Sequence, residues 1–186
     1  MIRIISGTHK GRRISAPSNL PVRPTTDFAK EGLFNVLGNR IDFEDETVLD
    51  LFAGTGNISY ELASRGCKNI TCVDTDARCI KFIQDTAAKF EFRSIRTLRS
   101  DVFSFIRKGG KPFSLIFADP PFDMEETVTL PKLIFDNNLL APGGLLIIEH
   151  PDTTRFTDTS NLKEVRKYGK VHFSFFGEEM ERDEEE

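Results

Sequence analysis

The stretch from Phe113 to Phe122 combines residue types that can hold and orient a polar ligand. Uncharged, mostly apolar residues 113–118 run into Asp119, Pro120, Pro121 and Phe122. The apolar run is typical of a strand buried on both faces, and the prolines end it because they cannot donate a ladder hydrogen bond. A carboxylate, a stiff turn and an aromatic ring therefore follow a buried strand, at the sheet edge where α/β proteins bind ligands. The alternative is a turn that only stops the strand.

A second candidate is the loop that follows the apolar run 47–53, where Asp50 precedes Gly54 and Gly56. Glycines between a strand and a helix let the backbone approach a ligand closely. Such a pair also fits NAD enzymes, but the third glycine of a dinucleotide fingerprint is missing. A carboxylate inside the strand, Asp50, suits a ligand with a cationic group better than a pyrophosphate.

Two further acids follow the next two predicted strands. Asp74 is placed to accept hydrogen bonds from two ribose hydroxyls. Asp101 is placed to accept one from an adenine amino group, with Val102 or Phe103 packing on the ring. Each acid alone is equally explained as a helix cap. Acids at three successive strand ends, Asp50 included, together favour a ligand site.

These residues need a scaffold in which strands and helices alternate. Apolar runs and helix-spaced patterns alternate through the middle of the chain, which predicts an α/β class with a mostly parallel sheet. A helix is expected after the cap cluster at residues 25–27, with apolar positions from Phe28 onward. A helix over 125–138 should restart at Pro131, and residues 141–144 read as a turn. Two closing strands are joined by a turn at Gly169.

Bulk properties describe an ordinary soluble globular protein. The chain has 186 residues, of which 39% are hydrophobic and 29% charged. No apolar run approaches the roughly 20 residues of a membrane span, so a cytoplasmic location is expected. The three cysteines have no metal or disulfide spacing, and Cys72 is expected in the core. No metal site is predicted.

Charge is distributed unevenly along the chain. The formal net charge is −4, but acids concentrate in the tail 178–186, which is expected to be disordered. No acid precedes Asp27, whereas several cations do. The basic start is either a solvated surface or a contact for an anionic partner. We expect an N-terminal basic extension with a helix (1–40), a main domain (41–177) and the tail (178–186).

The combined motifs resemble those of a known enzyme class. The run from Asp50 to Gly56, the later strand-end acids and Asp119-Pro-Pro-Phe122 are similar to S-adenosylmethionine-dependent methyltransferases that modify exocyclic amino groups. The last stretch is a form of their Asn/Asp-Pro-Pro-Tyr/Phe motif. Residues 3–13, 23–27 and 31–37 resemble the RsmD family more closely. Members of that family are bacterial methyltransferases that act on N2 of a guanine in 16S ribosomal RNA.

The resemblance implies a Rossmann-like class I fold, with a mostly parallel seven-stranded sheet, helices on both faces and a small N-terminal extension. It implies S-adenosylmethionine as cofactor, and 16S rRNA within a partly assembled small ribosomal subunit as partner. A monomer is expected. The predicted catalytic residues are Asp119, Pro120, Pro121 and Phe122. The predicted cofactor-binding residues are Asp50, Phe52, Gly54, Gly56, Asp74, Asp101, Val102 and Asp119. The predicted RNA-binding residues are Lys10, Arg12, Arg13 and Arg23.

The chain also departs from this family. Phe28 stands where the family usually has a basic residue, and Phe122 replaces the commoner Tyr of the wider amino-methyltransferase group. Phe keeps the stacking face that the chemistry uses. The competing hypotheses are an N-methyltransferase that acts on DNA adenine or on protein glutamine, and a nucleotide-binding oxidoreductase or non-catalytic binder.

Overall fold

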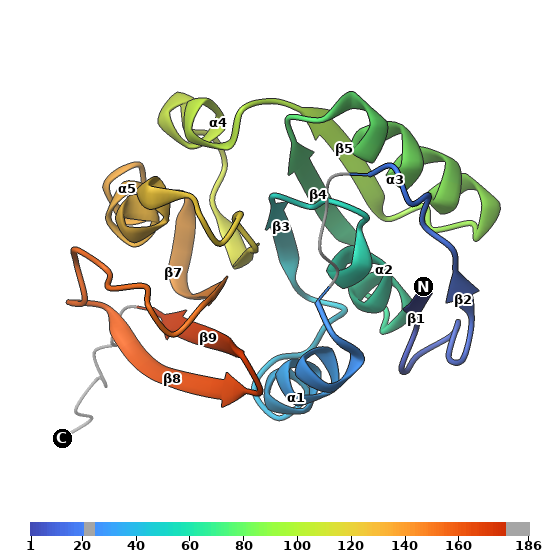
Figure 1. Ribbon diagram of the computed structural model, residues 1–186, viewed down its shortest axis with the longest axis horizontal. Coiled ribbons are helices and arrows are strands. Elements are labelled where there is room, and N and C mark those ends of the chain that lie inside the picture. Colours follow the sequence, from blue (N-terminus) through green and yellow to red (C-terminus); the bar gives the residue numbers. More distant parts are fainter. Residues whose placement is uncertain (21–24, 178–186) are drawn as a thin grey trace, which may run out of the picture.

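A seven-stranded sheet organises the molecule (Figure 1). The computed structural model describes residues 1–20 and 25–177, and the strand order is β5-β4-β3-β6-β7-β9-β8. The strands are β3 (Thr47–Leu51), β4 (Asn69–Asp74), β5 (Ile95–Arg99), β6 (Phe113–Ala118), β7 (Leu140–His150), β8 (Leu162–Tyr168) and β9 (Val171–Phe176). Pairing is parallel from β5 to β7, and β9 and β8 close the sheet antiparallel. The predicted mostly parallel seven-stranded sheet is confirmed.

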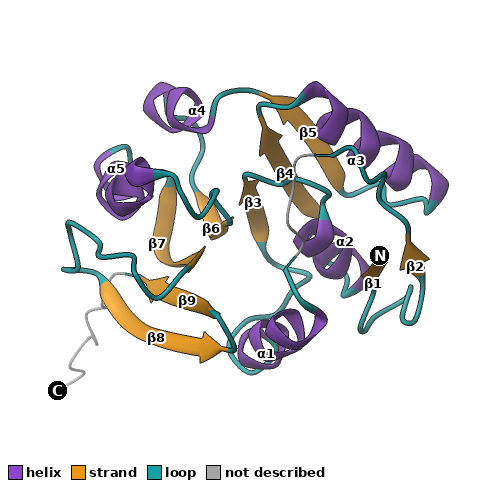
Figure 2. Ribbon diagram, viewed as in Figure 1, coloured by secondary structure: helices purple, strands orange, loops and turns teal. Residues whose placement is uncertain are grey.

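Helices cover both faces of this sheet (Figure 2). Successive strand side chains point to opposite faces, so Val48 and Leu49 of β3 belong to two different hydrophobic cores. Helices α1 (Asp27–Leu37), α2 (Asn57–Ser64) and α3 (Ala77–Lys89) supply the first core, and α4 (Val102–Lys108) and α5 (Leu130–Asp136) the second. Cys72 lies in the first core, as predicted.

The N-terminal segment packs on the first core. Strands β1 (Ile2–Arg3) and β2 (Arg13–Ile14) form a hairpin whose isoleucines are buried beside α1. Thr26 caps α1, since its side chain accepts a hydrogen bond from the Ala29 N–H at 3.2 Å. The predicted helix is confirmed, but Phe28 does not join its buried face and is 66% exposed. The hairpin and α1 therefore share one core with the sheet.

Two boundaries differ from the sequence-based expectation. The predicted turn at 141–144 lies inside β7, where the pairing register shifts between Phe113 and Leu115. Gly143, with φ +70°, absorbs this irregularity without breaking the strand. The predicted helix over 125–138 is split into a 3-10 turn, η1 (Glu125–Thr129), and α5. Pro131 lies in the first turn of α5, so the predicted restart is confirmed.

Candidate active site

Asp50 is a carboxyl group at the base of the site. It lies in β3, is only 2% exposed, and accepts a hydrogen bond from the Ser59 hydroxyl at 2.5 Å. Burial raises the pKa of Asp50 to about 7, and the nearby charge of Asp74 acts in the same direction, although the Ser59 hydrogen bond opposes both. Asp50 is thus a buried acid that a cationic ligand would stabilise in its ionised form.

The loop after β3 turns sharply beneath the site. Phe52 has φ +57°, a conformation that a non-glycine residue adopts only where its surroundings hold it. Gly54, with φ +54°, donates its backbone N–H to an Asp74 carboxylate oxygen at 2.8 Å. Gly56 is left-handed with φ +78° and begins α2. A Cβ there would lie 2.8 Å from the Tyr60 ring, so glycine is required for packing as well as for conformation.

Asp74 and Asp76, at and just after the end of β4, accept different hydrogen bonds and have different roles. Asp76 caps α3 through the Arg78 backbone N–H at 2.7 Å. Asp74 instead accepts from Gly54 N–H and, at 2.8 Å, from Asp76 N–H. The alternative explanation of Asp74 as the helix cap is therefore wrong. Each carboxylate oxygen of Asp74 has a second lone pair, which a ligand hydroxyl can use.

Asp101 caps helix α4, which was the alternative to a ligand-binding role for this residue. Its carboxylate accepts a hydrogen bond from the Ser104 backbone N–H at 2.8 Å, which lowers the pKa of Asp101. The cap does not remove it from the site, because both Asp101 and Val102 line the cavity described below. One acid thus fixes α4 and faces the cavity.

The Asp-Pro-Pro-Phe stretch follows β6 as predicted. The Asp119 backbone N–H reaches the Leu51 carbonyl at 3.3 Å, which holds the stretch next to the end of β3. Pro120 is buried, and Met124 donates back to the Pro121 carbonyl at 3.0 Å to close a turn. Phe122 is 37% exposed, so its ring remains accessible.

One cavity of about 500 Å³ brings these groups together at the carboxyl ends of the parallel strands. Of the predicted cofactor and catalytic residues, those that line it are Asp50, Phe52, Gly54, Asp74, Asp101, Val102, Asp119, Pro120, Pro121 and Phe122. Gly56 is not among the described residues that line it. The volume falls in the range of about 300–1,000 Å³ that is usual for small-molecule sites.

Several cavity residues escaped sequence reasoning. Thr25 donates its hydroxyl to Glu149 at 2.8 Å across 124 positions of sequence, and both side chains are buried in the wall. Asn57, the first residue of α2, also lines the cavity. Glu149 carried a usable signal, since it is another acid at the end of a buried strand. Thr25 and Asn57 had no such signal, because threonine and asparagine are ordinary near helix starts.

A buried polar network supports this wall. The Lys30 ammonium donates to the Arg3 carbonyl at 2.6 Å and to Asn57 Oδ1 at 2.8 Å, and lies 3.8 Å from a Glu61 carboxylate oxygen. Asn57 in turn donates to the Thr25 carbonyl at 3.2 Å. Burial lowers the pKa of Lys30, whereas the charge of Glu61 opposes that shift. The network joins the N-terminal hairpin to the cavity.

Three of the four predicted RNA-binding cations lie in or beside the turn of the N-terminal hairpin. Lys10, Arg12 and Arg13 are exposed, whereas Arg23 and the acidic tail lie outside the described residues. The hairpin turn contacts the C-terminal ends of two helices, since Thr8 N–H donates to Ser64 O at 2.7 Å and the His9 ring contacts Phe90 O at 3.0 Å. The cavity lies at the N-terminal ends of the same helices. Any partner that bridges both must be larger than a nucleotide.

The described residues contain neither a membrane-spanning helix nor a cluster of metal ligands. None of their helices is both long and apolar enough to cross a membrane. Within residues 1–20 and 25–177, no group of three or more His, Cys, Asp or Glu side chains is arranged to hold a metal ion.

Comparison with known proteins gives consistent matches along the chain. The family model described as Conserved hypothetical protein 95 matches residues 2–177. The chain is 31% identical over 179 residues to Ribosomal RNA small subunit methyltransferase D of Buchnera aphidicola, covering 94% of this chain and 91% of the relative. It is 35% identical over 151 residues to the Escherichia coli K12 protein of the same name, covering 80% and 74%.

A solved structure of Escherichia coli yhhF has the same fold. It superposes with a TM-score of 0.83 at 29% identity, covering 94% of this chain and 96% of that one. The sheet order and the helices on both faces are therefore those of a Rossmann-like class I methyltransferase.

Proposed function

The chain belongs to the RsmD family, whose model is described as Conserved hypothetical protein 95, and we propose that it transfers a methyl group from S-adenosylmethionine to N2 of a guanine in 16S rRNA. The observation that carries the proposal is a single cavity that holds Asp50, Asp74 and Asp101 together with the Asp119-to-Phe122 stretch. The relatives named as small-subunit rRNA methyltransferases support the RNA substrate.

The cavity fits the proposed cofactor. Asp74 and Asp101 offer acceptors for ribose hydroxyls and an adenine amino group, and Val102 offers an apolar surface for the ring. Asp50 is a buried carboxyl that suits a cation. Gly54, which has no side chain, lets the backbone approach the ligand closely. The sulfonium of the cofactor would supply an electrophilic methyl group.

The residues after β6 suit an amino group as nucleophile. A guanine N2 lone pair is delocalised into the ring, so the nitrogen must be turned toward the methyl group. The Asp119 carboxylate and the Pro120 carbonyl can each accept one amino N–H, which orients the lone pair and stabilises positive charge as it develops on nitrogen. Phe122 can stack on the base, and fixed orientation lowers the barrier further.

The RNA has to present the base out of its stack. A base stacked inside a helix cannot enter this cavity to meet Asp119, so the target guanine must be splayed out or flipped. The exposed cations Lys10, Arg12 and Arg13, together with Arg23, would contact phosphates and position the RNA without reading its sequence. A partly assembled small subunit, rather than a short oligonucleotide, is the proposed substrate, because the hairpin and the cavity lie at opposite ends of α2 and α3.

The test is methyl transfer from tritium-labelled S-adenosylmethionine into small-subunit particles from cells that lack this protein. We expect label in 16S rRNA, recovered as N2-methylguanosine after nucleoside analysis. Asp119→Ala should abolish transfer while the protein stays folded. Label in DNA or in a protein glutamine instead, or the absence of N2-methylguanosine, would overturn the proposed function.

A further inference from the structure

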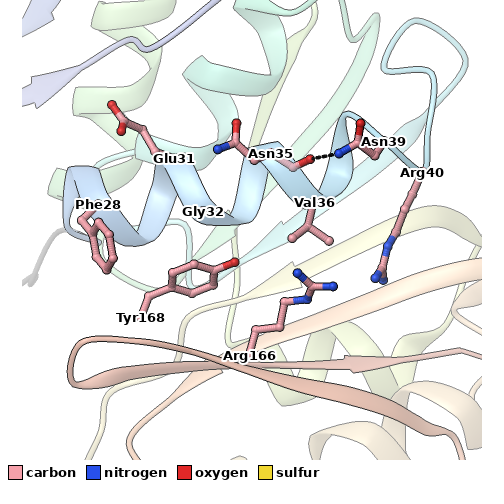
Figure 3. A pocket seen from close by; sticks show the side chains of 9 residues that line it. All are labelled: Phe28, Glu31, Gly32, Asn35, Val36, Asn39, Arg40, Arg166 and Tyr168. Atoms are coloured by element: carbon pink, nitrogen blue, oxygen red, sulfur yellow. Dashed lines mark hydrogen bonds between the residues drawn. The ribbon is translucent and has the colours of Figure 1, made fainter.

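A second concave surface lies beside the cavity, between α1 and β8 (Figure 3). This groove has a volume of about 580 Å³. Rings of Phe28 and Tyr168 lie at one end, Arg166 and Arg40 extend toward the other, and the Asn35 amide lines the helix side. Most of its side chains are aromatic, cationic or amide; the exceptions are Val36 and Glu31, whose carboxylate pairs with Arg3 at 2.8 Å.

Gly32 gives the groove its floor. A Cβ at this position would lie 2.1 Å from the Tyr168 ring, so only glycine lets the ring rest directly on α1. The Tyr168 ring also packs against Phe173, with centroids 5.8 Å apart, and edge-on against Phe28 at 5.9 Å. Tyr168 is therefore held in a fixed orientation, and Phe28 projects above it.

Phe28 is exposed in an unusual way. Its side chain is 66% accessible, although the ring is the kind that normally enters a core. An exposed ring beside a second aromatic is a stacking platform, and every nucleobase has a face that can use one. The favoured occupant of this end of the groove is therefore a planar base.

The two arginines provide positive charge farther along. Glu164 holds both, since its carboxylate pairs with Arg166 Nε at 3.0 Å and with Arg40 Nη2. Arg40 also stacks over the Phe175 ring, 5.4 Å from its centroid. A guanidinium has five N–H donors, and these ion pairs use only some of them. Both groups are thereby oriented and retain donors for a phosphate.

The groove begins where the cavity ends. Thr25 and Thr26, which line the cavity, directly precede α1, whose second residue is Phe28. On the other wall, Val171 lines the cavity and pairs in register with Tyr168. A chain that placed one base in the cavity would continue into the groove.

We propose that this groove binds the RNA nucleotides that flank the target base. This inference rests on the proposed function and names the part of the substrate that the enzyme holds outside its cavity. One flanking base stacks on Phe28 and Tyr168, and the neighbouring phosphates accept hydrogen bonds from Arg166 and Arg40. RNA is favoured over a protein partner because aromatic faces and guanidinium groups together match unstacked bases and phosphates.

The test compares Phe28→Ala and Arg166→Gln with matched controls on the opposite face of β8. Val165→Ala removes an apolar side chain that is 50% exposed, and Lys167→Gln removes an exposed cation. Affinity for small-subunit particles from cells that lack this protein is measured as a function of salt. Cofactor affinity and methyl transfer at saturating particles are measured in parallel.

We expect Phe28→Ala to weaken particle binding about tenfold, as loss of base stacking does. Arg166→Gln should weaken binding and reduce the salt slope by about 0.7, whereas both controls should match the wild type. Binding by both groove variants within twofold of the wild type would overturn the inference. If the wild type transfers no methyl group to RNA, the proposed function fails, and the binding comparison still reports on the groove.

A cross-linking experiment identifies the occupant. Phe28→p-benzoylphenylalanine places a photoreactive group at the groove entrance without disturbing the core. Cross-links to 16S rRNA beside the methylated guanine support the inference. Cross-links confined to a ribosomal protein would overturn it.

Discussion

Replacement of Asp50 by Asn should make the protein more stable at neutral and alkaline pH. Asn keeps the shape of the side chain and can still accept the Ser59 hydrogen bond, but it carries no charge into the buried base of the site. The pKa of Asp50 is raised from 3.8 to about 7, mainly by burial. At about 1.4 kcal/mol for each pH unit, this difference corresponds to about 4 kcal/mol of lost stability when the group ionises.

The pH dependence has a definite sign. Between pH 3.8 and about 7 the folded protein keeps a proton on Asp50 that the unfolded chain releases. The free energy of unfolding therefore falls as the pH rises through this range. Below pH 3.8 Asp50 is protonated in both states, so wild type and Asp50→Asn should be equally stable. Above pH 7 the variant should exceed the wild type by the full amount.

Urea denaturation followed by circular dichroism at several pH values between 4 and 8 measures this difference. Asp152→Asn is the control, because Asp152 is exposed and its substitution should change stability by less than about 0.5 kcal/mol. Equal stability of Asp50→Asn and the wild type at every pH would refute the reasoning. A gain in stability with weaker S-adenosylmethionine binding would show that Asp50 is kept for its ligand.

Three further variants test the residues that support the site and the hairpin beside it. Glu61→Gln should cost about 3–5 kcal/mol of unfolding free energy in urea, because it leaves the Lys30 ammonium buried without its charged partner. Gly56→Ala should cost about 1–3 kcal/mol in the same assay, because a Cβ there meets Tyr60 at a positive φ. A triple variant replaces the exposed hairpin cations by alanine, at Lys10, Arg12 and Arg13. It should lower the salt slope of particle binding by about 2, at about 0.7 for each lost phosphate contact.

Matched controls separate each cause from general damage. Glu44→Gln breaks the exposed ion pair with Lys68 and should cost less than about 1 kcal/mol of unfolding free energy. If Glu61→Gln costs as little, burial of the Lys30 ammonium is not what makes the Glu61 charge important. Gly169→Ala carries a positive φ but meets no atom within 4 Å, so it should cost less than Gly56→Ala. An unchanged salt slope would exclude the hairpin from RNA binding.

The parts of this molecule that sequence reasoning predicted are local in character. Buried strands such as β6 show as uncharged runs, and Pro120 or Gly169 end them through their own backbone restrictions. The acids at strand ends were predictable because parallel strands bring their carboxyl ends to one edge. The cofactor role predicted for Gly56 stays a prediction, because a left-handed glycine at a helix start looks the same whether it serves a ligand or packing.

The parts that were missed depend on contacts between distant residues. Lysine ordinarily lies at the surface. No residue near Lys30 in the sequence indicates that its ammonium is buried between Arg3 and α2. Likewise, the pairing of Thr25 with Glu149 spans 124 positions. The exposure of Phe28 was also unpredictable, because helical spacing alone cannot tell which positions a neighbouring strand will cover.

The network around Lys30 has a consequence for synthesis of the chain. Ile5 and Ser6 are made early, yet their backbone N–H groups find their acceptor only when Glu61 has been made, and the Ser6 carbonyl finds its donor only when Ser64 has been made. The hydrogen bond of the Thr25 hydroxyl forms later still, since β7 must be in place before Glu149 can accept it. Domains generally fold as units during synthesis. These early residues therefore reach their final packing late, and their docking completes the cavity.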